Sequence, residues 1–428
     1  RAFRNTDLGG ELVIPGLVTV IESETFQGTS FTGLTLGSGL TEIQNAAFSN
    51  MPSLYGSLSI PNSVEVIGES AFYGTPLNGS LTLGSSVRTI GATAFAESGL
   101  SGLLSIPNSV TSIGQQAFQG TDFTSLTLGN SLQTIGLGAF DGVPLAGALS
   151  VPDSVTTIGV SAFYGTQFDD ELTLGSGLQT IGSDAFTGGP EFTGSLTIPG
   201  SVTNIGERAF VGNLFTALTF ASRASTTAID LDAFKDIATF GGNLAVPEGV
   251  TSIGTYAFAG TGFDGHLTIP ASLTFISDGA FAGSSFTSVT LGANLTSIGV
   301  EAFRNVSLDE ALTIPSNVTS VGARAFELTS ITSVSLPSGL TSIGDSAFAS
   351  ISTLEGELSL PAGLVTLGPG AFYGTNISGS LTIPSGVTSI AASTFGGTRV
   401  SNVRLGNAIT SIGAQAFYRT AVETLTLP

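Results

Sequence analysis

The sequence predicts a β-rich solenoid, a single array over residues 1–428 of about 19 coils around one continuous core. An Ala-Phe or equivalent pair recurs along the whole chain, and 19 of its 29 phenylalanines stand 22 to 24 residues apart. A unit this short cannot bury its own apolar face, so neighbouring units must stack. The 58 glycines and 17 prolines supply corners between short apolar runs. Together, the period and the corners favour stacked coils over a globular core.

Each unit begins with a short predicted strand. Leu126 and Leu128 alternate with Thr127, which is the two-residue period of a strand. Gly129 ends this run, and Pro107 ends the equivalent run of the preceding coil, at a corner where no ladder donor is needed. Coils that end in Ile-Pro mostly alternate with coils that end in Leu-Gly, so the larger unit has about 46 residues.

A second apolar run and a turn complete the unit. Val110 and Ile113 supply the second run, and Gly114 follows it. We expect a short helical or 3-10 turn from there to Ala117 and Phe118, too short for a regular α-helix. Stacking then aligns Leu, Val or Ile, Ala and Phe in columns, and these columns form the core.

The repeated unit resembles the BspA-like, or Treponema pallidum-type, leucine-rich repeat. Residues 104–118 carry the resemblance, and the pattern returns at 196–210 and 312–326. The resemblance covers essentially all 428 residues. It implies a leucine-rich-repeat solenoid of the kind that host-associated bacteria and protists secrete or display for adhesion and protein binding. It implies no catalytic residues, and the family's usual Cys after Phe-x-Gly is most often Thr in this chain.

Composition and charge exclude several classes of function. The chain has 11 basic and 31 acidic residues, so binding to nucleic acid or anionic lipid is disfavoured. It has no cysteine, which removes disulfides, thiol nucleophiles and Cys-ligated metals. Gly, Ser or Thr interrupts every apolar stretch long before the roughly 18–20 residues that a spanning helix needs. We therefore expect no nucleic-acid partner and no membrane insertion in this segment.

Candidate catalytic chemistry is sparse. The lone His266 occupies an outward, variable strand position, and Lys235 is similarly isolated, so no Ser-His-Asp arrangement is available. The acidic clusters at 169–171 and 309–310 offer paired carboxylates for glycosidase chemistry or calcium bridging. Both clusters lie on a repeating loop edge, where solvation is the simpler interpretation. We expect no enzymatic activity, catalytic residue, cofactor or metal.

The outward side of the first strand is the candidate contact face. Its middle residue is Thr in 11 of 19 coils and Ser in five more. Strand propensity on a solvated face explains this without a ligand. The alternatives are contact with another sheet or a polysaccharide, and an ice-binding ladder, although Glu11 and Glu171 break the neighbouring column. The candidate contact residues are Thr35, Thr82, Thr127, Thr173, Thr197, Thr219, Thr268, Thr290, Thr313 and Thr382.

One coil and both ends depart from the pattern. The coil near 211–243 is degenerate, and Pro247 is followed directly by Pro270, which indicates either a recombination seam or a bulge that bears a site. The array opens in mid-coil and shows no polar cap at either end, so we expect a slice of a longer protein or copies that meet head to tail.

Five Asn-x-Ser/Thr sequons are candidate glycosylation sites if the protein is secreted by a eukaryote, although chance explains most of them in a chain so rich in Ser and Thr. They begin at Asn78, Asn294, Asn305, Asn317 and Asn376.

These observations predict a non-enzymatic repeat scaffold, extracellular or on a cell surface, for adhesion through binding of protein or glycan. Many weak contacts along a repeated surface would add by avidity. One alternative is a structural subunit of an extracellular filament that self-associates through its solenoid ends. The other is ice binding through the Thr ladder.

Overall fold

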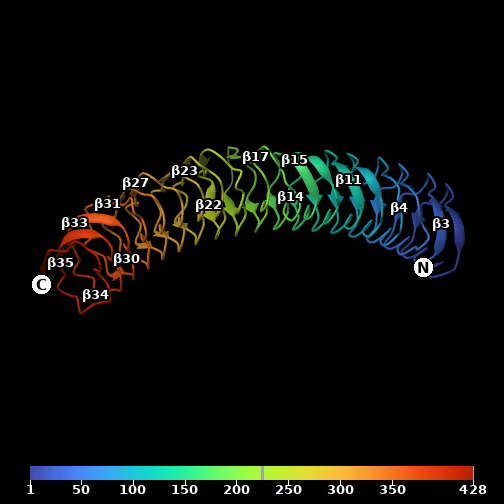
Figure 1. Cartoon of the computed structure of the whole chain (residues 1–428). Helices are drawn as coiled ribbons and strands as arrows, with labels where there is room; N and C mark the ends of the chain where they lie inside the picture. Colours follow the sequence, from blue (N-terminus) through green and yellow to red (C-terminus); the bar gives the residue numbers. More distant parts are fainter. Residues whose placement is uncertain (223–225, 428) are drawn as a thin grey trace. The chain divides into compact units, whose positions relative to one another are not determined.

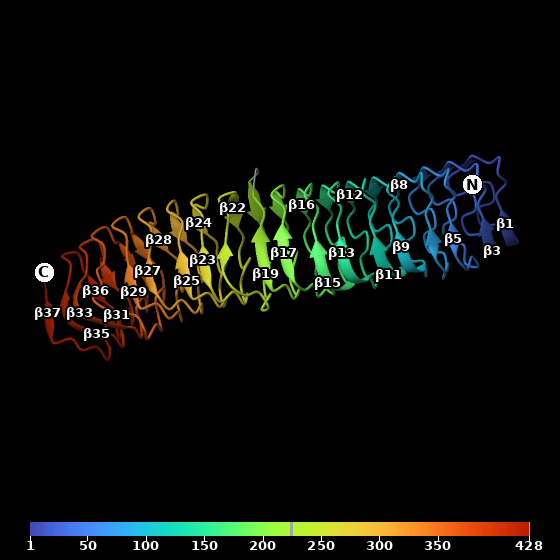
Figure 2. The same cartoon turned by 90° about the horizontal axis from the view of Figure 1, so that it is seen from above.

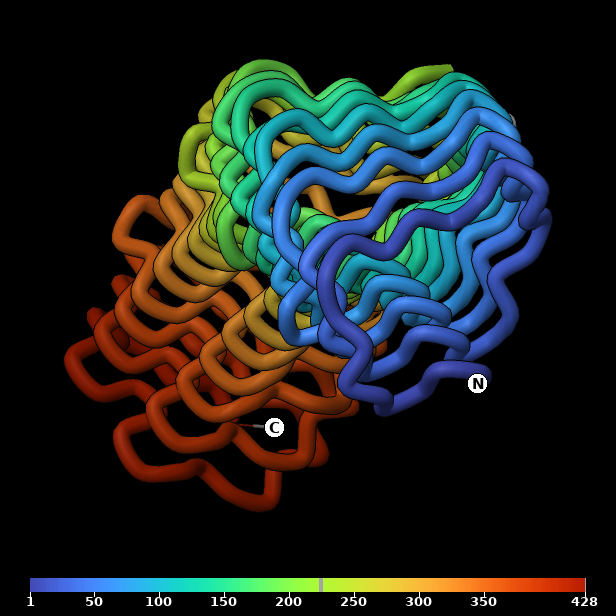
Figure 3. Tube along the Cα trace, turned by 90° about the vertical axis from the view of Figure 1, so that its right-hand side faces the viewer, coloured from blue at the N-terminus to red at the C-terminus, as the bar shows by residue number. Residues whose placement is uncertain are grey.

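The computed structural model describes residues 1–222 and 226–427. The chain forms two compact units, Arg1–Ser225 and Thr226–Pro428, and the boundary between them falls in the coil that departs from the sequence pattern. Each unit is a stack of coils with short strands on two sides, as the strand labels in Figures 1 and 2 show. In the first unit, successive coils lie one behind the other when viewed from its end (Figure 3).

The second strand of each coil builds a parallel sheet of two-residue strands. In the first unit this sheet runs unbroken from one coil to the next, since each Ile pairs with the Ile of the following coil. Its strands are β2 (Val20–Ile21), β4 (Glu42–Ile43), β6 (Val66–Ile67), β8 (Thr89–Ile90), β10 (Ser112–Ile113), β12 (Thr134–Ile135), β14 (Thr157–Ile158), β16 (Thr180–Ile181) and β18 (Asn204–Ile205). In the second unit they are β20 (Thr227–Ile229) with β22 (Val250–Ile253), then β24 (Phe275–Ile276), β26 (Ser297–Ile298), β28 (Ser320–Val321), β30 (Ser342–Ile343) and β32 (Thr366–Leu367), and finally β34 (Ser389–Ile390) with β36 (Ser411–Ile412).

The first strands behave differently, because they form separate small parallel sheets. In the first unit these sheets are pairs: β1 (Gly9–Val13) with β3 (Ser30–Thr35), β5 (Leu58–Ser59) with β7 (Leu81–Thr82), β9 (Ser101–Ser105) with β11 (Asp122–Thr127), β13 (Ala146–Ser150) with β15 (Gln167–Thr173), and β17 (Ser195–Ile198) with β19 (Ala217–Phe220). In the second unit the sheets are β21 (Leu244–Ala245), β23 (His266–Thr268) and β25 (Ser288–Thr290), then β27 (Ala311–Thr313) with β29 (Ser333–Ser335), and last β31 (Glu355–Gly356), β33 (Asn376–Thr382), β35 (Arg399–Arg404) and β37 (Thr424–Thr426).

The corner residues explain the pairing in twos. Within the pair β9–β11, a Cβ added to Gly129 would lie 2.6 Å from the carbonyl carbon of Pro107, so any side chain at this position would force the backbone to shift. In the pair β5–β7, a Cβ added to Gly84 would lie at the same distance from the carbonyl carbon of Pro61. On its other side each glycine coil meets the proline of the next coil, which has no N–H to offer a neighbouring strand. The alternation of Pro and Gly therefore separates one tight contact from the next.

The core is a column of phenylalanine rings, one from each coil. The ring of Phe118 is buried and stacks at 5.5 Å from Phe95 and 5.4 Å from Phe140, with planes within 8° of parallel. Ile113 and Ala117 are also buried, as the predicted columns require. Offset aromatic pairs stabilise beyond the burial of apolar area alone, so the column links each coil to the next at its core.

The predicted helical or 3-10 turn before each phenylalanine is wrong in detail, because the described residues contain no helix. From Phe26 onward, two left-handed residues flank each ring of the column instead: φ is 52° at Gln116 and 67° at Gly120, on either side of Phe118. A left-handed residue cannot continue a right-handed helix. The N–H of Gln116 donates to the carbonyl of Leu137 in the next coil, so the turn bonds between coils.

Threonine fills the position where the resembled family usually has cysteine. The hydroxyl of Thr121 donates to the carbonyl of Phe118 at 2.7 Å, and Thr75 and Thr166 make the same bond to the phenylalanine three residues earlier. All three side chains are buried. The carbonyls of Phe118 and Phe163 also accept the backbone N–H of the same threonine, so each threonine closes its turn with both its main-chain and its side-chain donor.

Candidate contact face

The candidate contact residues lie on the first strands with their side chains directed outward. Nine of the ten are exposed, and Thr268 is half-buried. The serines at the same position in other coils, Ser105 and Ser150 among them, are exposed as well. The outward direction that the strand period predicts for these threonines is confirmed, and their role in contact with a partner stays a prediction.

Hydroxyls within a strand pair can bond to one another along the row. The Oγ1 atoms of Thr197 and Thr219, which are paired in register on β17 and β19, are 2.9 Å apart. His266 lies on the same face of the second unit and bonds to Ser288 through Nδ1 at 2.7 Å and to Thr290 through Nε2 at 2.9 Å. The imidazole is therefore part of the hydroxyl network, and no acidic partner is bonded to it among the described residues.

Two grooves cross this face where the sheet is interrupted. The first, of about 320 Å³, lies between β11 and β13, and the second, of about 390 Å³, lies between β25 and β27. The first is lined by Leu126, Thr127, Leu128, Asn130, Ala148, Leu149, Ser150, Pro152, Glu171 and Thr173. The second is lined by Val289, Thr290, Leu291, Ala293, Ala311, Thr313, Pro315 and Ser316.

The interruption leaves backbone donors at both grooves. In the pair β9–β11, the N–H of Ile106 donates to the carbonyl of Thr127 at 2.9 Å. Within the described chain, the corresponding N–H groups of Leu128 and Leu291 form no such bond to the coil that follows. A ligand in the groove can therefore be met by main-chain as well as side-chain groups.

Another hollow lies on the turns of the second unit and has a different character. It has a volume of about 490 Å³, and Tyr373, Pro369 and Gly370 line one part of it. The nearby ion pairs run between coils: Arg304 meets Glu327 at 2.7 Å and Arg324 meets Glu301 at 3.2 Å. The hydrogen bond that Arg304 donates to the carboxylate of Glu327 raises the pKa of Arg304 above its ordinary value. These pairs are solvent-accessible, with only the carboxylates largely covered, and pairs of this kind contribute little to stability.

The other singled-out side chains have local partners. The ammonium of Lys235 lies 3.5 Å from Asp232 and 5.5 Å from the centre of the Tyr256 ring. In the first acidic cluster, Asp169 accepts the N–H of Gly147 at 2.9 Å, so it supports a left-handed glycine of the previous coil. No group of three potential metal ligands occurs within the described residues. Residues 223–225 of the degenerate coil lie outside the described part of the chain.

The five sequon asparagines differ in how far their side chains are engaged. The amide nitrogens of Asn294, Asn317 and Asn376 donate to backbone carbonyls of the preceding coil at 2.6 to 3.0 Å. Asn78 is exposed and uses its carbonyl oxygen to accept the N–H of Gly56. Asn305 is exposed with a φ of 56°. Glycosylation at these positions stays a prediction.

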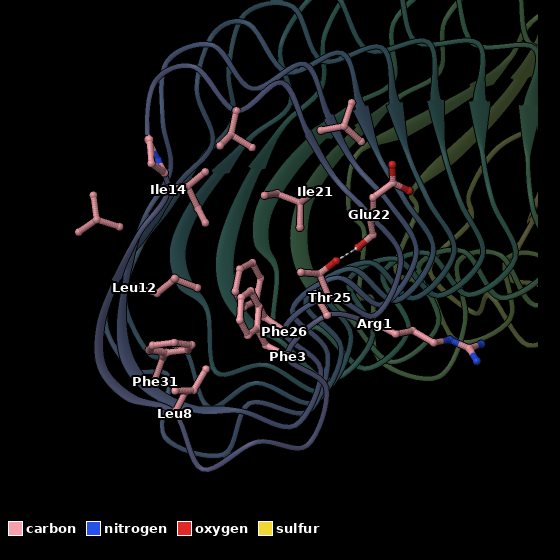
Figure 4. Close-up of a pocket in the computed structure, with 15 residues that line it drawn as sticks. Arg1, Phe3, Leu8, Leu12, Ile14, Ile21, Glu22, Thr25, Phe26 and Phe31 are labelled. Atoms are coloured by element: carbon pink, nitrogen blue, oxygen red, sulfur yellow. Dashed lines mark hydrogen bonds between the residues drawn. The ribbon is translucent and has the colours of Figure 1, made fainter.

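An apolar hollow of about 570 Å³ lies in the first coil, where Phe3, Leu8 and Phe26 line it together with Ile14 and Ile21 (Figure 4). The side chains are those that form the core columns in later coils. The ring of Phe3 stacks on Phe26 at 5.4 Å, as the rings of interior coils do. The hollow therefore belongs to the repeat core and has no chemistry of its own.

Sequence reasoning missed the grooves because it treated the first strands as one flat sheet. The signal was present in the alternation of Pro and Gly corners, which marks where one strand pair ends. A second signal is the small residue two positions before the hydroxyl, which is Ala148 in one groove and Ala311 in the other. Leu103 and Glu357 occupy that position in other coils.

Stacked coils with paired Leu-x-Leu strands, a buried Ile column and a stacked Phe column define a leucine-rich-repeat solenoid. The sequence matches the BspA type leucine rich repeat region, a family unit of six repeat copies, over residues 1–122, 102–217, 227–355 and 322–428. The chain therefore belongs to the BspA type leucine-rich-repeat family, as the resemblance predicted.

Solved structures share similarity with this chain at low identity. A leucine-rich repeat protein from Bacteroides ovatus is 17% identical, with a TM-score of 0.46, and the match covers 86% of this chain and 78% of that one. A leucine rich cell surface protein from Faecalibacterium prausnitzii is 23% identical, with a TM-score of 0.34, over 88% of this chain and 83% of that one. A search of curated proteins finds no significant match. No helix in the described part of the chain has the length and apolar character of a membrane span.

Proposed function

We propose that the protein is a non-enzymatic scaffold, outside the cell or on its surface, that adheres to a protein or glycan partner through its first-strand face. The observation that carries this proposal is the row of exposed hydroxyls, held in register by strand pairs such as β17–β19. Membership of the BspA type family supports a scaffold role. The scattered His266 and Lys235, each with a local partner, give no support to a catalytic centre.

The mechanism is geometric and rests on repetition. Each hydroxyl offers one weak contact, and the backbone of the strand fixes its position, so little entropy is lost when a partner binds. Several such contacts in one partner add by avidity. The net charge of −20 favours neutral or basic partners over anionic ones.

Two other roles remain as alternatives. Ice binding needs regular rows on a flat sheet, and the interruption between β11 and β13 counts against it. A head-to-tail filament predicts polymers whose size rises with protein concentration, which analytical sedimentation measures directly.

The adhesion proposal is tested by binding of the full chain to a panel of matrix proteins and polysaccharides. Saturable binding is expected, and the variant Thr127→Lys/Thr173→Lys should weaken it more than about tenfold. The matched control is Thr156→Lys/Thr203→Lys, which adds the same charge in a column where the chain itself carries Arg88. No binding above that of an unrelated acidic protein, or equal weakening by both variants, would contradict the proposal.

A further inference from the structure

We propose that the two grooves between strand pairs are subsites for an uncharged glycan. Each groove would bind sugar residues of a glycan chain or of one of its branches. This inference rests on the proposed adhesion function and names its ligand class and position. The groove between β11 and β13 and the groove between β25 and β27 belong to different units, so the same feature arises twice in the molecule.

The two grooves share their construction. In each, a hydroxyl on either side of the break faces the opening: Thr127 and Ser150 in the first groove, Thr290 and Thr313 in the second. An alanine, Ala148 or Ala311, forms the low part of the wall. Their volumes of about 320 and 390 Å³ are at the lower end of the range for small-ligand sites.

The lining is suited to hydroxyl-rich ligands. Sugar hydroxyls both donate and accept, and Thr and Ser hydroxyls do the same. The first groove adds the amide of Asn130 and the carboxylate of Glu171, and a carboxylate can accept hydrogen bonds from sugar hydroxyls. The unpaired N–H of Leu128 adds a fixed donor. Apolar ring faces can rest on Ala148 and Pro152.

The same lining disfavours the other classes of partner. Among the described residues that line either groove, none is Arg, Lys or aromatic. A protein partner is held mainly by Trp, Tyr and Arg anchors in central pockets. An anionic glycan needs basic groups, and Glu171 would repel it. An uncharged glycan meets neither obstacle.

Another coil of the same chain carries a larger residue at the position of the groove alanines. Leu103 stands on β9 at the position equivalent to Ala148, and its side chain is 56% exposed. Leucine is therefore compatible with the fold at this position. The variant Ala148→Leu/Ala311→Leu should fill both grooves and leave the coils intact.

The experiment is native gel electrophoresis of the full chain in gels that contain galactomannan, xyloglucan or mixed-linkage β-glucan, with heparin as the anionic comparison. At least one neutral polysaccharide should retard the wild type, and heparin should not. The groove-filled variant should bind more than about tenfold more weakly. The control Thr156→Val/Thr319→Val, which adds apolar surface on the second sheet where Val365 stands naturally, should bind as the wild type does. Circular dichroism checks the fold of both variants.

Three results would overturn the inference: retardation by none of the neutral polysaccharides, retardation by heparin alone, or equal retardation of wild type and groove-filled variant. The matrix-protein panel separates this failure from failure of the adhesion proposal. If the wild type binds a matrix protein and no polysaccharide, the scaffold role stands and the glycan subsites are wrong. Loss of protein binding in the groove-filled variant would assign the grooves to a protein partner instead.

Discussion

The two sheets of the first unit are built from the same coils, yet one is continuous and the other is divided into pairs. The second-strand sheet repeats Ile-Gly in most coils, and every Ile pairs with the next. The first-strand sheet ends alternately in Pro and Gly and breaks after each glycine coil. The comparison shows that a solenoid can be rigid along one side and segmented along the other, and the segmented side is the one that carries the candidate grooves.

The largest expected effect on stability comes from a change in the core, which supports the continuous and the divided sheet alike. Phe118→Ala removes a buried ring that stacks on two others and supports both sheets. We expect a loss of about 3–5 kcal/mol in the free energy of unfolding, because the cavity cannot collapse between fixed coils. Urea unfolding followed by circular dichroism measures it. A loss below about 1 kcal/mol would mean that the column is not the main support of the array.

A smaller effect is expected on the continuous side. In Gly136→Ala the new Cβ would lie 2.6 Å from the carbonyl carbon of Gly114, so two coils must shift. Strand β12 of this coil is hydrogen-bonded to both neighbouring coils, which resist the shift. The shift is attainable, because Ala391 occupies the equivalent position after Ile390 in the second unit. We expect a loss of about 1–3 kcal/mol in the same unfolding experiment.

Gly129→Ala makes the matched change on the segmented side. Its Cβ also lies 2.6 Å from a backbone carbon, that of Pro107. The coil has no ladder bond on its far side at this strand, so it can move toward the groove. We expect a loss of about 1 kcal/mol, near the lower limit for overpacking. A loss equal to that of Gly136→Ala would contradict the difference between the sheets.

The smallest expected effect concerns a corner of the pair β13–β15. The N–H of Ser176 donates to the carboxylate of Asp153 at 2.7 Å, and this bond holds the pKa of Asp153 below its ordinary value. Because the folded pKa is lowered, the contribution to stability is present above the unfolded pKa of about 3.9 and disappears as the pH falls through the folded value.

Asp153→Asn tests this corner, since Asn108 makes the same bond to the N–H of Asn130. The melting temperatures of wild type and variant should differ more at neutral pH than at pH about 2. The same difference at both pH values would show that the carboxylate makes no charge-dependent contribution.

Much of the fold was predictable because repetition averages out the uncertainty of any one coil. Residues such as Ile113 and Phe118 recur at fixed spacing, so their burial followed directly. The turn was less predictable, since Gln116 gives no local sign of a left-handed backbone. Such a conformation costs little when the next coil supplies a hydrogen bond, and that bond depends on stacking that local sequence does not encode.

The exposed threonine side of the first strands was predictable, but the grooves that cross it were not. Alternation placed Thr127 outward, whereas the break beside it depends on how Pro107, Gly129 and Pro152 meet in space. Pro270 shows that proline alone is insufficient, because its coil still pairs with the preceding one through β21 and β23. The combination of a tight glycine on one side and a proline on the other has to be seen in three dimensions.

The direction of the ladder bonds has a mechanical consequence within each unit. The strands run across the direction of stacking, so the bonds between coils point along it. Tension along the stack is carried by every interface between coils in series, so the interface with the fewest bonds should open first. In the first unit the interfaces between strand pairs lack first-strand ladder bonds, so extension should begin at these interfaces and separate blocks of two coils.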